Sequence, residues 1–207
     1  MEGIGGSGKS TLAARLVKWL QERNLLVTAS REPGATALGA ELRRLLLEGR
    51  FAPVPWADAF LFEADRAQTY ATVVEPALSA GHVVVSDRNL YGTIAYQGFA
   101  SGLDVEVIDV LNRAATGGRY PDLLFVVDAE PQLAIERKRG STQKDRFDER
   151  DITFQAAARK GYLFAAGRDP DRAHVLDGAD PADVVFAVAQ QIVDTALSTR
   201  RLTVRRA

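Results

Sequence analysis

Eight residues near the N-terminus have the types and the spacing needed to hold the phosphates of a nucleotide. The run Gly3-Ile4-Gly5-Gly6-Ser7-Gly8-Lys9-Ser10 fits the pattern G-x-x-x-x-G-K-[ST] of the P-loop, and Thr11 follows it. Small residues let backbone N–H groups turn toward phosphate oxygens, and a following helix adds the positive end of its dipole. We therefore expect all nine residues, from Gly3 to Thr11, to bind ATP. Lys9 would reach the β- and γ-phosphates, and the hydroxyl of Ser10 would bind Mg²⁺.

Two further charged positions follow apolar runs that are typical of buried parallel strands. Asp87 and Arg88 come directly after residues 83–86, and Arg31 follows residues 25–29. Ligands of open α/β sheets bind at the carboxyl ends of strands, so these side chains are expected at one edge. There Asp87 can assist Mg²⁺, and Arg88 can hold a phosphate with two hydrogen bonds. Taken alone, these positions also fit a surface salt bridge and an ordinary loop.

Two predicted helices carry side chains with the shape and polarity to recognise a base. Phe62 and Arg66 are four residues apart, as are Thr93 and Gln97, so each pair shares a helix face. An aromatic ring and a guanidinium can stack on a base and bind its edge, while Tyr96 would lie near a sugar. Each face taken by itself is explained as well by core packing and routine helix contacts.

Strands and helices alternate along the chain, which is typical of a doubly wound α/β fold with a parallel sheet. The predicted strands are residues 25–29, 83–86, 123–127 and 174–176. The predicted helices are residues 11–22, 37–48, 56–79, 104–116, 131–139, 152–167 and 182–198. A polar, basic segment at residues 137–146 interrupts two helices and is predicted to be a mobile loop.

Composition excludes several classes of protein. The chain has 207 residues, a net charge of −1 and no cysteine. It therefore suits a single domain without disulfides or a thiolate zinc site, and no overall field attracts nucleic acid or an anionic membrane. No apolar run reaches the roughly 18 residues of a membrane span, and the absence of cysteine fits a cytoplasmic protein. The basic C-terminal residues are expected to be a frayed end.

The start of the chain departs from the usual context of a P-loop. A buried strand of about five residues normally precedes the loop, yet only Met1 and Glu2 stand before Gly3. We expect either a first strand that is nearly absent or a chain without its true beginning. If an apolar run belongs upstream, a longer chain should melt at a higher temperature.

Taken together and in order, these segments resemble the bacterial thymidylate kinase family of P-loop nucleoside monophosphate kinases. The matching segments are residues 2–11, 31–36, 62–66, 87–89, 95–98 and 137–148, and the similarity continues to about Leu197. The resemblance implies a three-layer P-loop NTPase fold with a parallel five-stranded sheet, whose first strand is truncated here. It also implies one domain over residues 1–207, with a helical lid inserted at about 137–150.

The resemblance further implies that a homodimer transfers the γ-phosphoryl group of ATP to dTMP, giving dTDP, with Mg²⁺. Its small-molecule substrates would be the partners, without nucleic acid or membrane. The implied substrate-binding residues are Arg31, Phe62, Arg66, Arg88, Thr93, Tyr96 and Gln97, with Ser10 and Asp87 at the metal. Arg31 and Arg88 would hold the dTMP phosphate, and Phe62 would stack on thymine.

The resemblance implies that a positively charged side chain of the lid stabilises the transition state. Gly6 stands where some family members carry an arginine, and members with glycine there take the needed arginine from the lid. Arg137, Arg139 and Arg146 are the candidates here. The implied catalytic residues are then Lys9, Arg88, Arg139 and Arg146.

Three departures surround the acceptor. Gly5 replaces an acidic residue that helps organise the acceptor arginine and the metal, Asn89 replaces an aromatic residue, and Leu90, Tyr91 and Gly92 replace a small, polar stretch. They leave two alternatives: a kinase of the same fold for another or modified pyrimidine nucleoside monophosphate, or a catalytically weak nucleotide-binding protein. For a weakened dTMP kinase, Gly5→Asp is expected to raise activity on dTMP.

Overall fold

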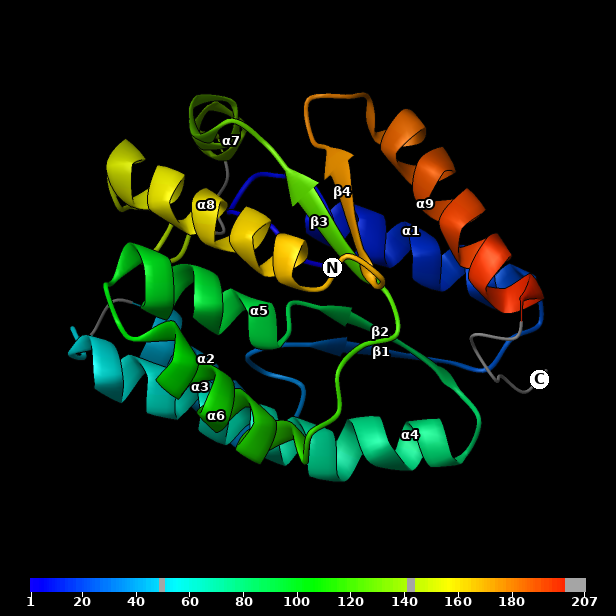
Figure 1. The fold of residues 1–207 in the computed structure, drawn as a ribbon, viewed down its shortest axis with the longest axis horizontal. Helices are drawn as coiled ribbons and strands as arrows, with labels where there is room; N and C mark the ends of the chain where they lie inside the picture. The colour runs from blue at the N-terminus through cyan, green and yellow to red at the C-terminus, as the bar shows by residue number, and fades with distance from the viewer. Residues whose placement is uncertain (49–50, 141–143, 200–207) are drawn as a thin grey trace.

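Two pairs of parallel strands form the centre of the protein, for which a computed structural model describes residues 1–48, 51–140 and 144–199. Strand β1 (Val27–Arg31) pairs with β2 (Val83–Asp87), so that Arg31 lies opposite Asp87. Strand β3 (Leu124–Asp128) pairs with β4 (Ala173–Asp177). Figure 1 shows the N-terminus between the two pairs, with helices on both sides of the strands.

Met1 and Glu2 join the two pairs, Met1 at the carboxyl end of β2 and Glu2 beside the middle of β3, where it bridges to Val126. The Met1 ammonium donates a hydrogen bond to the Ser86 carbonyl (2.7 Å), and the Arg88 N–H donates to the Met1 carbonyl (2.9 Å). On the other side, the Glu2 N–H donates to the Phe125 carbonyl at 2.8 Å. The fold is thus α/β as predicted, but within the described residues the single five-stranded sheet is replaced by two pairs and this bridge.

A cavity lies between β2 and β3, and Met1 and Glu2 are among the residues that line it. It has a volume of about 340 Å³ and is lined by both strands and by apolar side chains such as Leu16, Leu20 and Val74. Protein interiors are normally close-packed, so a void of this size leaves its lining without contacts on one side.

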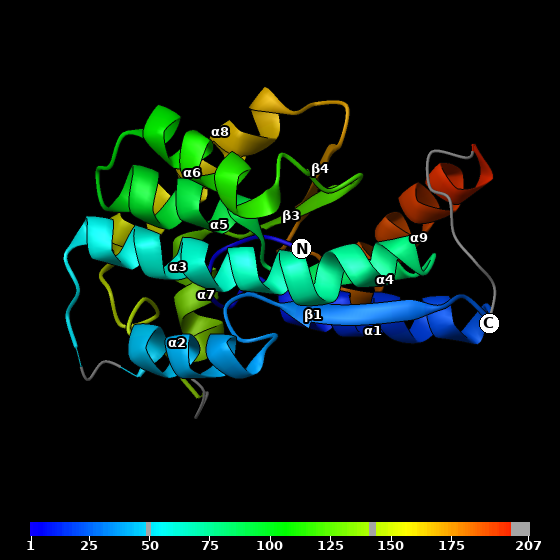
Figure 2. The ribbon, with the colours of Figure 1, turned by 90° about the horizontal axis from the view of Figure 1, so that it is seen from below.

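Helices α1 (Lys9–Glu22) and α9 (Ala182–Ser198) pack together and cover one side of the strands, where Leu16 and Val185 share a buried cluster. On the other side, α8 (Ile152–Arg168) packs on the π-helix η2 (Ile94–Ala100). The remaining helices are α2 (Ala37–Leu47), α3 (Pro55–Thr69), α4 (Glu75–Ser79), α5 (Leu90–Thr93), α6 (Val105–Thr116) and α7 (Pro131–Lys138). In Figure 2, α2 and α3 lie at the end of the molecule away from α9.

Two predicted elements differ from the structure for local reasons. The single helix expected over residues 56–79 is divided by a π-helical turn, η1 (Tyr70–Val74), just before Pro76. Proline has no N–H to donate and crowds the preceding turn, which favours a local change of register. Strand β1 starts at Val27 because the Leu25 N–H still donates to the Leu20 carbonyl at the end of α1.

The described residues contain no helix that is long and apolar enough to cross a membrane. Residues 141–143 of the expected lid and the basic C-terminal segment 200–207 lie outside the described residues.

Candidate active site

The P-loop wraps tightly because three of its glycines adopt backbone angles that suit only glycine. Gly3, Gly6 and Gly8 have φ values of 141°, 84° and 104°. A Cβ atom on Gly3 would lie 2.5 Å from the Val127 carbonyl oxygen, and one on Gly6 would lie 2.2 Å from that of Ala134. Gly8 caps α1, which begins at Lys9. A side chain at position 6, an arginine included, would therefore collide with α7.

A pocket of about 560 Å³ opens beside this loop and has the size of a nucleotide site. Gly6, Ser7, Gly8, Lys9, Ser10 and Thr11 line it from the P-loop and the start of α1, whereas Gly3, Ile4 and Gly5 do not. Arg137 and Lys138 line it from α7, together with Gly178 beyond β4. We call this pocket the donor pocket.

Lys9 is poised in the donor pocket for an anion. Its side chain is almost wholly buried, and burial, followed by the nearby charge of Arg88, lowers the pKa of Lys9 to about 8. A phosphate would reverse that shift because it offsets the cost of burying the ammonium.

Ser10 and Asp87, the two residues predicted to hold a metal, lie together. Burial alone would raise the pKa of Asp87, but the charge of Lys9 and a hydrogen bond from Ser10 outweigh burial and lower it. The Oδ1 atom of Asp87 is buried without a hydrogen-bond partner in the described residues. These oxygens fit Mg²⁺, which binds one or two protein ligands and completes its shell with phosphate oxygens and water. The described residues hold no group of three or more acidic, histidine or cysteine side chains that could bind a metal ion by themselves.

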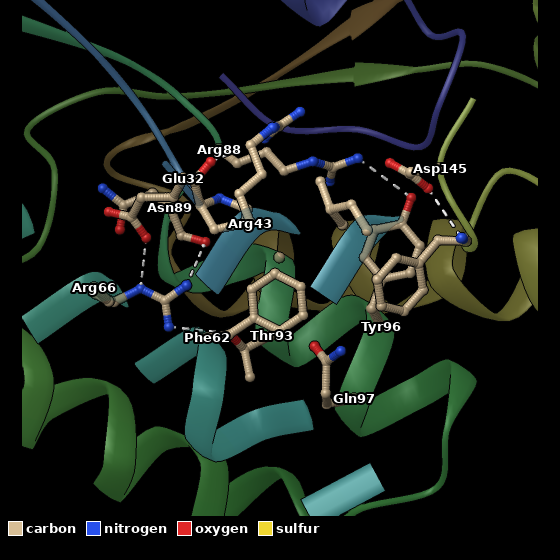
Figure 3. Close-up of a pocket in the computed structure, with 14 residues that line it drawn as sticks. Glu32, Arg43, Phe62, Arg66, Arg88, Asn89, Thr93, Tyr96, Gln97 and Asp145 are labelled. Carbon is tan, nitrogen blue, oxygen red and sulfur yellow. Dashed lines mark hydrogen bonds and ion pairs between the residues drawn. The ribbon is translucent and has the colours of Figure 1, made fainter. Parts of the chain in front are cut away.

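A second pocket lies on the other side of Arg88, and we call it the acceptor pocket (Figure 3). Six of the seven predicted substrate-binding residues line it, namely Phe62, Arg66, Arg88, Thr93, Tyr96 and Gln97. Arg31 is exposed at the end of β1 and lines neither pocket. Glu32, Arg43, Asp145 and Phe147 also line the acceptor pocket and were not predicted from the sequence, whereas Asn89, which was expected near the acceptor, lines it too.

Arg66 serves chiefly to fix the walls of the acceptor pocket. The buried guanidinium donates through Nε to Glu32 (2.9 Å) and through its terminal nitrogens to Thr93 (3.0 Å) and to the Asn89 carbonyl (3.1 Å). It also donates hydrogen bonds to the side-chain oxygens of Glu63 and Asn112. Burial raises the pKa of Glu32 to about 7 despite this pairing. Most Arg66 donors are therefore engaged by protein, which leaves little for a base.

Gln97 is better placed to recognise a base. It is buried, and its Nε2 has no hydrogen-bond partner among the described residues. A buried amide without a partner is costly and favours a ligand that supplies an acceptor. The rings of Phe62 and Tyr96 flank the same space.

Phe147 narrows that space in this conformation. Its ring centre lies 6.0 Å from that of Phe62 and 5.3 Å from that of Tyr96. The acceptor pocket has a volume of only about 60 Å³, well below the roughly 300 Å³ of a small-ligand site. The pocket must widen before a nucleotide can enter, and Phe147 lies between the two rings that would flank a base.

Positive charge gathers at the boundary between the pockets. Arg88 adopts a left-handed backbone (φ 72°) and donates to the Tyr162 hydroxyl at 2.5 Å. No carboxylate in the described residues lies within ion-pair distance of it, so its charge is available to an anion. Arg43 of α2 donates to the Pro33 carbonyl (2.8 Å), and burial and the charges of Arg31 and Arg88 lower its pKa. Nothing in the sequence marks Arg43 beyond its place in a predicted helix.

The predicted lid arginines are not gathered at the boundary. Arg137 lines the donor pocket and donates to the Gly178 carbonyl at 2.7 Å. Arg139 is exposed and lines neither pocket. Arg146 is turned toward α2 and α3, where it pairs with Asp58 and bonds the Leu46 carbonyl. Their roles stay predictions.

Comparison with known proteins agrees with this geometry. The family model described as thymidylate kinase matches residues 1–188. A thymidylate kinase from Desulfosudis oleivorans is 41% identical over 190 residues, which cover 88% of this chain and 89% of that protein. One from Desulfovibrio desulfuricans is 39% identical, over 96% of this chain and 95% of that protein. The crystal structure of thymidylate kinase from Ehrlichia chaffeensis superposes with a TM-score of 0.76 at 29% identity, covering 93% of this chain and 95% of that one. The chain belongs to the thymidylate kinase family.

Proposed function

We propose that this protein transfers the γ-phosphoryl group of ATP to the phosphate of dTMP, giving ADP and dTDP. One observation carries the proposal beyond family membership. Asp87 and Arg88 are consecutive residues at the end of β2: Asp87 lies beside Lys9 and Ser10 of the donor pocket, and Arg88 lines the acceptor pocket with its base-recognising side chains. Two phosphates bound on either side of this pair would face each other.

The chemistry at that boundary would be almost entirely electrostatic. Phosphoryl transfer needs alignment of the two reactants and neutralisation of charge, with little covalent work by the protein. Lys9 would bind the β- and γ-phosphates of ATP. Ser10 and Asp87 would hold Mg²⁺, which supplies further neutralising charge. Arg88 and Arg43 would hold the acceptor phosphate, whose oxygen is already anionic and needs no general base.

The acceptor pocket suits a pyrimidine once Phe147 withdraws. Phe62 would stack on the base, and Gln97 and Thr93 would bind its polar edge. Arg66 supports this wall through its bonds to Glu32 and Thr93. Arg31, Arg139 and Arg146 would contribute only after the segments that carry them rearrange around the substrates.

We further propose a cytoplasmic homodimer that contacts through α3 and α6. These helices pack on each other and expose apolar side chains, with Phe60 at 55% and Val110 at 63%. Sedimentation of the wild type and of Val110→Asp would test the dimer, since a buried charge should shift the population to monomer.

Product identification tests the proposed reaction. The protein is incubated with Mg²⁺, ATP labelled in the γ-phosphate and dTMP, and the nucleotides are separated. Label should move into dTDP, and Lys9→Ala should reduce the rate by about two orders of magnitude because it removes a charge-stabilising group. Lys18→Ala is the matched control, since Lys18 is 80% exposed on the same helix. Label that stays in ATP with the wild type would refute the proposal.

A further inference from the structure

A carboxylate from outside the P-loop occupies the space beside Gly5. A Cβ atom on Gly5 would lie 1.8 Å from Oδ1 of Asp148, so the two cannot coexist without a shift. Gly5 does not belong to the glycines with positive φ, and its backbone would accept other residues. Glycine at this position therefore leaves room for Asp148.

The Asp148 carboxylate is held in a defined orientation. Its Oδ2 accepts from the Lys138 ammonium at 2.8 Å and from the Asp145 N–H at 3.2 Å. The side chain is only 6% exposed. Oδ2 thus fixes Lys138, while Oδ1 rests on the P-loop.

Lys138 brings a second ammonium group to the donor pocket. It ends α7 and lines the donor pocket together with Lys9. Burial lowers the pKa of Lys9 and raises the pKa of Tyr96, and the charge of Asp148 partly offsets the first shift and adds to the second. Arg146 pairs with Asp58, away from both pockets, and Arg137, which also lines the donor pocket, donates to the Gly178 carbonyl.

We propose that Lys138 is the cation of the lid segment that stabilises the transferred phosphoryl group, and that Asp148, seated against Gly5, is the residue that positions it. The proposal rests on the proposed phosphoryl transfer and assigns the role that the sequence had given to the lid arginines. A lysine ammonium is a compact charge on a flexible stem, so a carboxylate partner is needed to hold it at one place.

Four proteins test the pairing: wild type, Lys138→Met, Asp148→Asn and the double variant, each with saturating ATP and dTMP. Each single change should lower kcat by about 10²-fold, and the double change should lower it no further, because Asp148 acts through Lys138. The KM for ATP should change much less than kcat. Lys18→Met is the control for a lost lysine charge on an exposed helix surface.

Two results would overturn the proposal. One is a Lys138→Met variant whose kcat stays within about threefold of the wild type. The other is single losses that multiply to about 10⁴-fold in the double variant, since independent groups add in free energy. A wild type that transfers no phosphate to dTMP would instead defeat the proposed function. Melting temperatures of all four proteins identify a variant that has failed to fold.

Position 5 supplies an independent test that leaves Lys138 and Asp148 chemically intact. Gly5→Ala places its Cβ against Asp148 and should lower kcat as Asp148→Asn does. Gly5→Asp should also lower it, contrary to the expectation from the sequence. In an Asp148→Gly background, however, Gly5→Asp should raise kcat at least about tenfold by returning the carboxylate from the other side. Wild-type activity in Gly5→Ala, or no rescue in the variant that combines Asp148→Gly with Gly5→Asp, would refute the placement of Asp148 against Gly5.

Discussion

Binding of ATP should draw a proton from solution, because Lys9 is partly neutral in the free protein. Burial and Arg88 lower the pKa of Lys9 to about 8. A bound triphosphate should return it to its ordinary value of about 10.5 or above, since the phosphate charge favours the ammonium. Lys9 then carries more protons in the nucleotide-bound protein than in the free protein, so binding of ATP takes up protons from solution.

The magnitude depends on pH in a way that identifies the group. The expected uptake is about 0.1 proton per nucleotide at pH 7, about 0.5 at pH 8 and about 0.9 at pH 9. Calorimetric titration with MgATP, without acceptor, in two buffers of different ionisation enthalpy measures it directly. The apparent affinity for ATP should accordingly weaken as the pH rises above 8.

Lys9→Arg is the matched control. A guanidinium stays charged throughout this range, so the variant keeps the positive charge but has no proton to gain. Its uptake at pH 9 should fall by most of the wild-type value. Equal uptake in the two proteins, or none in the wild type, would show that Lys9 is already fully charged and would refute the reasoning.

Three further predictions concern other parts of the molecule. Arg88→Ala should weaken the binding of dTMP by about 2–5 kcal/mol and the binding of ATP much less, because of the two pockets Arg88 lines only the acceptor pocket. Calorimetry with each nucleotide checks this, and equal losses of binding free energy would contradict the assignment. A bisubstrate analogue should change hydrogen exchange in residues 144–150, since the acceptor pocket must widen at Phe147 for a base to enter; identical exchange would mean that the base binds elsewhere. Fusing a short Val- and Ile-rich segment to Met1 should raise the melting temperature by filling the cavity between β2 and β3, at about 1.5–3 kcal/mol per buried aliphatic side chain; an unchanged melting temperature would show that the cavity does not accept a strand.

Local sequence rules located the parts of the site that lie within one element. The P-loop spacing identified the donor pocket, and the order of apolar runs placed Asp87 and Arg88 at a strand end. The four-residue spacing of Thr93 and Gln97 put both on one wall of the acceptor pocket. In each case the information needed, a turn, a helical period or a strand end, is contained in a few consecutive residues.

Contacts between distant segments could not be predicted in the same way. Arg66 looks like a base-binding group from its helix face, but Glu32 and Asn112, 34 and 46 residues away, engage most of its donors. The space beside Gly5 is taken by Asp148, and no property of the P-loop sequence indicates it. Phe147 and Arg43 enter the acceptor pocket only because the fold brings their segments there.

A comparison of acceptors tests the central claim most directly. The wild type is assayed for ADP release with MgATP and each of dTMP, dUMP, dCMP, dGMP and dAMP, and kcat/KM is compared. The account predicts that dTMP has the highest kcat/KM of the five. Turnover of another monophosphate in preference to dTMP, or no acceptor-dependent release of ADP at all, would contradict it.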